Sequence, residues 1–192
     1  GMWRDGCGDY QLDHSGGNLA RPSIVRGAHR RLETASRHVL LNLVTCWVDP
    51  LASILAPLRE VFDLGCRSGD FEYASYAAHG YVHNAIYAGR PLLPLRSEAV
   101  ELGDAMRELG SMNALHVHTP YEQLLASLTG ELSEPWRLDG GDFDEEETLA
   151  RYTAEGSRSG IFVQRTVMGL ARYLFGRYGE ASECFEIARA HL

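Results

Sequence analysis

The chain has 192 residues, 45% of them hydrophobic, which is enough to build the core of one domain or of one piece of a larger solenoid. The formal net charge of -8 argues against a nucleic-acid partner, because binding to a phosphate backbone usually needs a basic face. The longest apolar stretch, VLLNLVTCWV, is about half as long as the roughly 20 residues that a membrane span requires. We therefore expect a cytoplasmic protein that binds neither nucleic acid nor a membrane.

Residues 1–27 are rich in glycine and polar residues and show no helical periodicity, which predicts an irregular N-terminal arm. Trp3 is the side chain that we expect to anchor this arm. Residues 28–192 have the spacing of helices throughout. We therefore divide the chain into an arm, residues 1–27, and a TPR-like helical domain, residues 28–192.

From residue 28 onward, apolar residues recur every three or four positions, and Gly, Pro and Asp interrupt them as they do at helix ends. About eight helices are expected, covering residues 28–47, 51–67, 71–88, 92–109, 113–128, a stretch that begins at 144, 158–175 and 178–191. A loop is expected at residues 130–142. No segment alternates apolar and polar residues as a strand would. Short connections make neighbouring helices antiparallel, so the helices should pair into hairpins.

Two helix junctions share one pattern, in which a glycine is followed two residues later by an aromatic and three residues after that by an alanine. Glycine allows the tight turn, the aromatic would fill the wedge between the two helices, and alanine lets their backbones approach. The C-terminal copy continues with the aromatic and alanine spacing of tetratricopeptide (TPR) repeats. The pattern consists of Gly69, Phe71 and Ala74 in the first copy, and Gly176, Tyr178, Ala181, Phe185 and Ala188 in the second. It predicts an all-α, TPR-like α-solenoid of about four antiparallel helical hairpins.

The run WVDPLASILAPLREVFDLGCRSGDFEYASYAAHGYVHNAIYAGRPL and the final run GLARYLFGRYGEASECFEIARAHL resemble the helical region of large bacterial multidomain signalling proteins. In that family a Ser/Thr kinase-like domain and a predicted ATPase precede these helices, and GAF and histidine-kinase domains follow. The resemblance implies a non-catalytic interaction or regulatory module. Its partner would be a protein, a peptide, or the kinase or ATPase domains of the same signalling system. Arg172 departs from the TPR pattern, which usually has a tyrosine there.

The aromatic segment 71–87 supplies the candidate binding surface. Tyr76, His79, His83 and Tyr87 follow one another at spacings of three, four and four residues, which places them on one helix face. In TPR-like stacks such residues line a concave groove that holds a peptide or a small ligand. We therefore predict that these four residues bind a partner. A small-molecule sensor with an aromatic and histidine-lined pocket is the alternative.

Catalytic chemistry finds little support in the sequence. The pairs His79 with His83 and His116 with His118 leave open a metal-dependent enzyme, because histidines at such spacings can share a zinc ion. The four cysteines are scattered without a CxxC pair, and no GxSxG, phosphate-binding loop or kinase motif occurs. We interpret the acidic run 142–147 as a solvated helix cap. We expect no catalytic residue and no cofactor, and leave a homodimer open because the last helix ends without a polar capping helix.

Overall fold

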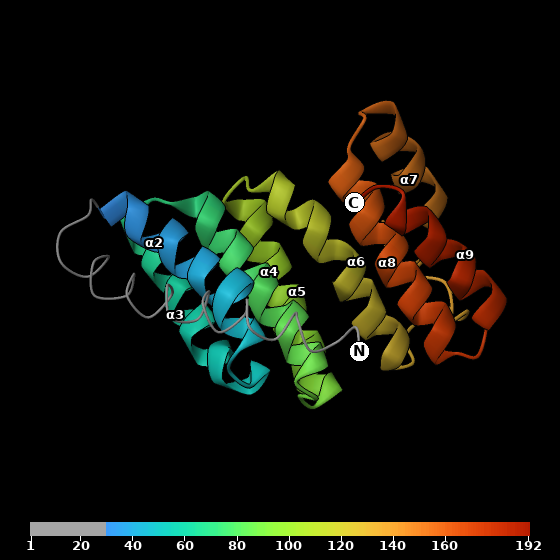
Figure 1. Ribbon diagram of the computed structural model, residues 1–192, viewed down its shortest axis with the longest axis horizontal. Helices are drawn as coiled ribbons and strands as arrows, with labels where there is room; N and C mark the ends of the chain where they lie inside the picture. Colours follow the sequence, from blue (N-terminus) through green and yellow to red (C-terminus); the bar gives the residue numbers. More distant parts are fainter. Residues whose placement is uncertain (1–29) are drawn as a thin grey trace, which may run out of the picture. The chain divides into compact units, whose positions relative to one another are not determined.

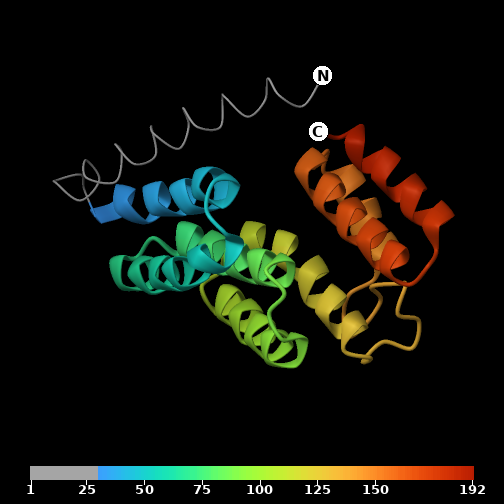
Figure 2. The same ribbon diagram turned by 60° about the horizontal axis from the view of Figure 1, so that its bottom comes forward.

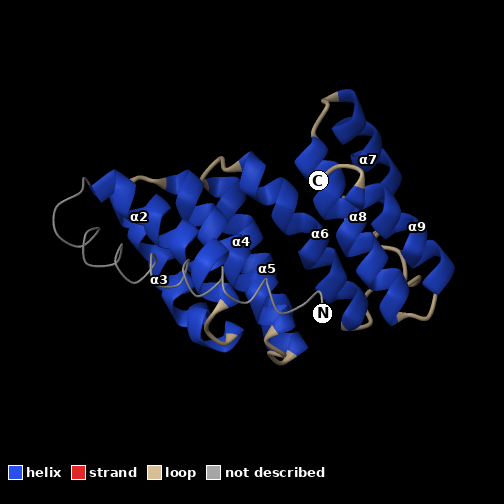
Figure 3. Ribbon diagram, viewed as in Figure 1, coloured by secondary structure: helices blue, strands red, loops and turns tan. Residues whose placement is uncertain are grey.

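The computed structural model describes residues 30–192, and the predicted arm, with Trp3, lies outside them. The described residues contain eight α-helices, α2 to α9, and no strand, which confirms the all-α class (Figures 1 and 3). By its contacts the chain divides into two compact units, residues 1–90 and residues 91–192. We call these unit 1 and unit 2.

Unit 1 contains three α-helices, of which α3 and α4 lie side by side and α2 packs against both (Figure 1). Its elements are α2 (Arg30–Val39), a π-helical turn (Leu40–Val44), a 3₁₀ turn (Thr45–Trp47), α3 (Leu51–Ser68) and α4 (Phe71–Tyr87). The single helix expected at 28–47 therefore changes its hydrogen-bond pattern at residue 40. Asn42 of the π turn lies against Gly80 of α4 and accepts a hydrogen bond of 2.8 Å from Asn84 Nδ2. A partly buried polar pair thus joins the turn to α4.

Unit 2 contains five α-helices in a chain of neighbours, in which α5 packs with α6, α6 with α8, and α8 with both α7 and α9 (Figure 2). They are α5 (Leu92–Glu108), α6 (Met112–Leu128), α7 (Glu145–Ala154), α8 (Arg158–Leu174) and α9 (Tyr178–Arg189). Residues 129–144 connect α6 to α7, and this connection is much longer than the others in the unit. Connections of such length are uncommon in compact domains and often carry function.

Glycines end the helices in the way that the sequence pattern indicates. Gly69 and Gly176 adopt φ of 76° and 77°, a left-handed conformation that costs little only for glycine. The residue after each glycine donates its N–H to a carbonyl five residues back, from Asp70 to Gly65 and from Arg177 to Arg172. The same ending recurs at Gly89, Gly110, Gly130 and Gly156. These local signals place the helix boundaries within a residue or two of those expected.

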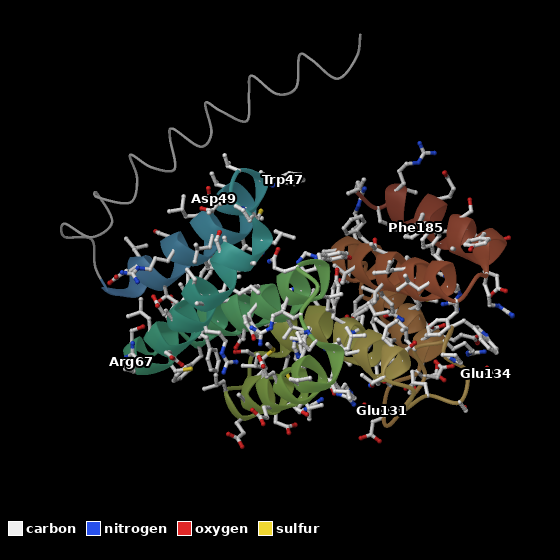
Figure 4. All side chains as sticks on the ribbon, turned by 90° about the horizontal axis from the view of Figure 1, so that it is seen from below. Trp47, Asp49, Arg67, Glu131, Glu134 and Phe185 are labelled. Carbon is white, nitrogen blue, oxygen red and sulfur yellow. The ribbon has the colours of Figure 1, made fainter. Side chains whose placement is uncertain are left out.

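The other residues of the repeat pattern divide into two groups. Ala74, Ala181 and Ala188 are buried, as close helix packing requires. Phe185 of α9 covers Gly169 of α8, because a methyl group built on Gly169 would lie 2.7 Å from its ring (Figure 4).

The two aromatics that should fill the wedges instead lie at the surface. Phe71 is 42% exposed and Tyr178 is 65% exposed. Each is the first residue of its helix, and a helical side chain leans toward the N-terminal end of its helix. Both rings therefore lie at the end of a hairpin, and the expected wedge role is corrected for both.

Gly65 is the point of closest approach in unit 1, and replacing it tests this packing. A methyl group on Gly65 would lie 2.7 Å from Ala74 Cβ and 2.9 Å from the Asp70 carbonyl oxygen, so backbone would have to move. We expect Gly65→Ala to lower the free energy of unfolding by about 1–3 kcal/mol. Gly179→Ala is the control, because open space surrounds that helical glycine, and it should add about 0.5–1 kcal/mol. Chemical unfolding followed by circular dichroism measures both, and a shift of the two variants in the same direction would contradict the packing.

Candidate functional site

The predicted surface on α4 forms a row of rings along the helix. His79 and His83 stack with centroids 6.0 Å apart, and Tyr87 meets His83 edge-on at 5.1 Å. Burial lowers the pKa of His83, so this ring is neutral at pH 7. Tyr87 is about half exposed, whereas the two histidines are partly buried. The structure therefore brings together three of the four predicted residues, which we call the ring row.

Tyr76, the fourth predicted residue, belongs to a neighbouring cluster. Its ring lies 6.1 Å from that of His38 and 6.2 Å from that of Tyr73. Burial first, and then the charge of Glu72, raise the pKa of Tyr76. The side-chain amide of Asn84 donates a hydrogen bond to Asn42 Oδ1 in the π-helical turn. Tyr76 therefore extends the aromatic surface toward α2, while Asn84 holds the helix in place.

The metal alternative gains no support from the described part of the chain. Among residues 30–192, no three His, Cys, Asp or Glu side chains come close enough to hold a metal ion. The buried His118 instead directs Nε2 to the carbonyl oxygen of Ala99 at 2.8 Å. His116 packs its ring against Tyr152 at 5.9 Å. These two histidines thus serve separate packing roles.

Unit 2 contains a pocket of about 470 Å³ that lies among α5, α6, α7 and the connection 129–144. Pockets of this volume are in the range that holds small organic ligands. Its wall carries three arginines and three carboxylates, together with aromatic and aliphatic side chains. The charged residues are Arg96, Arg107, Arg151, Glu122, Glu131 and Asp142. The charges of the wall therefore balance.

Glu122 is the most deeply placed charged group of this pocket. The residue is 7% exposed, and its Oε1 lies 3.4 Å from Arg96 Nη1. Arg96 in turn makes its shorter bonds to Glu131, at 3.0–3.2 Å, at the start of the connection. Within the described residues, Glu122 Oε2 is buried and accepts no hydrogen bond. Burial raises the pKa of Glu122, against the opposing charges of Arg96 and Arg107.

Glu145, the first residue of α7, binds the connection whose residues 140–143 line the pocket. Glu145 is 1% exposed and receives two bonds from Arg172 of α8, of 3.1 Å and 2.7 Å. Its Oε1 also accepts the N–H of Leu138 at 2.8 Å, and its carbonyl accepts Gln164 Nε2 at 2.8 Å. Glu145 N–H donates to Asp139 Oδ1 at 2.8 Å. One residue therefore fastens the connection 129–144 to both α7 and α8.

This network corrects the interpretation of residues 142–147 as a solvated cap. Asp144 does cap α7, since its Oδ1 accepts the N–H of Glu147 at 2.8 Å. Glu146 and Glu147 are exposed, but Glu145 is buried and paired. The sequence does not distinguish Glu145 from the other acidic residues of this run, because they are of the same type. Its partner Arg172 lies 27 residues away in the sequence. The departure of Arg172 from the TPR pattern was the available signal, because an arginine at a helix-packing position needs an acidic partner.

No protein-family model, curated protein or solved structure matches this chain. No helix among residues 30–192 combines the length and apolarity that a membrane crossing requires. The fold and site together define an all-α protein of paired helices, with a ring row on α4 in unit 1 and a charged pocket in unit 2.

Proposed function

We propose that the chain is a non-catalytic interaction and regulatory module of a bacterial signalling system. The helices form TPR-like hairpins that act in the cytoplasm and bind a protein or peptide segment. The kinase or ATPase domains of the same system are the partners that the family resemblance implies.

The packing of α8 and α9 supports the TPR-like part of this proposal. The turn at Gly176, the buried Ala181 and Ala188, and the ring of Phe185 on Gly169 match the roles of these residue types in TPR hairpins. The near-equal helices α3, α4, α5, α6 and α8, each of 17 or 18 residues, fit a repeated helical unit.

The ring row carries the binding part of the proposal. Aromatic side chains with a polar edge are enriched at protein interfaces, because they bury a large area and still donate or accept hydrogen bonds. Tyr87 offers half of its surface, and the stacked His79 and His83 continue the same face along α4. An extended segment placed along α4 would contact all three rings.

Selection of a displayed random-peptide library on the immobilised full chain tests this proposal. We expect enriched peptides whose affinity falls by about tenfold in Tyr87→Ala, because truncating a central interface aromatic removes 1 kcal/mol or more. Tyr173→Ala is the matched control, since Tyr173 is a similarly exposed aromatic on α8 of unit 2. No enrichment, or an equal loss in the two variants, would exclude the ring row as the binding surface.

A sensor of small molecules is the second candidate function, and the pocket of unit 2 favours it. This pocket is lined by His116 and Tyr152, but not by the histidines and tyrosines of α4 that the sequence indicated. Ligand occupancy there would be coupled to the connection 129–144 through Glu131 and to α7 through Arg151. A ligand could thus change how unit 2 presents itself to a partner.

A further inference from the structure

The buried carboxylate of Glu122 lacks a donor on one of its two oxygens. Oε1 lies 3.4 Å from Arg96, a long contact, while Oε2 is buried with no hydrogen-bond partner among the described residues. A buried carboxylate oxygen without a donor is costly, and native proteins satisfy nearly all such atoms. Arg96 is already committed to Glu131. A ligand that brings an ammonium group to Oε2 would supply the donor.

Guanidinium groups with unused donors lie on the same wall. Arg151 makes no ion pair in the described part of the chain, and its guanidinium lies 5.5 Å from the ring of Tyr152. Arg107 uses Nη1 for the exposed Asp104, at 2.6 Å. A methyl group on Gly103 would lie 2.9 Å from Glu122 Oε2 and 3.6 Å from Arg107 Nη1, so both groups lie beside the same glycine of α5. Arginine pairs well with carboxylates, because its planar donors match their geometry.

Apolar side chains form part of the pocket wall, beside the polar His116, Thr119, Gln123 and Thr148. Leu115, Leu132, Phe143 and Met112 line it, and its volume of about 470 Å³ exceeds what one small zwitterion occupies. A ligand with one positive and one negative group also preserves the charge balance of the wall. Neither a simple cation nor a simple anion would do so.

We propose that this pocket binds a free α-amino acid with an apolar side chain, its ammonium group on Glu122 Oε2 and its carboxylate on Arg107 and Arg151. The proposal rests on the sensor function above and is independent of the ring row on α4. Among apolar amino acids, leucine, methionine and phenylalanine suit the aliphatic and aromatic lining.

Calorimetric titration of the full chain with each of these three amino acids tests the proposal. We expect binding of at least one of them, and no binding of its N-acetyl derivative, in which the ammonium group is gone. Glu122→Gln should weaken binding by about tenfold or more, since it replaces a charged hydrogen-bond acceptor. Arg151→Gln should weaken it similarly. The controls Glu101→Gln and Arg189→Gln, which change exposed residues of α5 and α9, should leave the affinity unchanged.

Gly103→Ala gives an independent check that keeps every charge, because its methyl group would displace Glu122 Oε2, and it too should weaken binding. Circular dichroism establishes that each variant retains its helices. The proposal is overturned if none of the three amino acids binds, if the N-acetyl derivative binds equally well, or if Glu122→Gln binds like the wild type. Tyr87→Ala should bind the amino acid normally, so that failure of this site and failure of the ring row are distinguishable.

Discussion

Replacing Arg172 by leucine is expected to lower the free energy of unfolding of unit 2 by about 3–5 kcal/mol. The variant leaves the Glu145 carboxylate buried without its cation, and removing one partner of a buried ion pair has a cost of this size. Arg172 is only 11% exposed on its side chain, so water cannot replace it readily. The hydrogen bond and charge of Glu145 raise the pKa of Arg172 despite its burial, so the guanidinium stays charged at every pH of interest. Urea unfolding at pH 7, followed by circular dichroism, measures the change.

Two further variants separate the buried pair from a general effect of losing an arginine. Arg189→Leu removes an exposed arginine paired with Glu186 and should change stability by less than about 1 kcal/mol. The double variant Glu145→Gln with Arg172→Leu should recover part of the loss, because no uncompensated charge is then buried. Equal losses in Arg172→Leu and Arg189→Leu, or a double variant less stable than Arg172→Leu alone, would show that the ion pair does not hold the connection 129–144.

Lowering the pH from 7 to 4 is expected to remove roughly 3 kcal/mol of stability through His118 alone. Burial above all, and then the charge of Arg107, lower the pKa of His118 to about 4 against the bond to Ala99. The unfolded chain takes up the proton near pH 6.5, whereas the folded chain does so only near pH 4. The contribution is therefore complete above pH 6.5, is lost as the pH falls toward 4, and changes no further below that.

Other groups titrate in the same range, so the contribution of His118 is measured as the difference in stability between the wild type and a variant that lacks this histidine. Burial also lowers the pKa of His38, His83 and His116, so these groups too reduce the stability of the fold as the pH falls. Burial raises the pKa of Glu122, which increases stability as the pH falls. His118→Gln keeps an N–H for the Ala99 carbonyl but does not titrate. Urea unfolding of both proteins between pH 7 and pH 4 should show the variant gaining roughly 3 kcal/mol relative to the wild type. Parallel stability curves would mean that the pKa of His118 is the same in the folded and the unfolded chain.

The candidate sites differed in how far they could be predicted. The ring row follows from helical spacing, since residues three and four apart share a face, and His79, His83 and Tyr87 do lie together. The pocket could not be predicted in this way. Its residues come from α5, α6, α7 and a long connection, and no local pattern reports which of these segments meet.

The amino-acid sequence by itself determined the class and most helix boundaries, because both depend on interactions within a few residues; the exception is the end of α2 at Val39. Apolar periodicity selects helix over strand, and a glycine such as Gly176 ends a helix wherever it occurs. Only the tertiary structure decided which polar residues became buried. Glu145 and Arg172 meet because α7 packs on α8, and the Glu122 carboxylate is buried because α6 packs on α5, where Gly103 and Arg96 lie beside it. Such burial depends on contacts between distant segments, so identical residue types in one acidic run, such as Glu145 and Glu146, end in opposite environments.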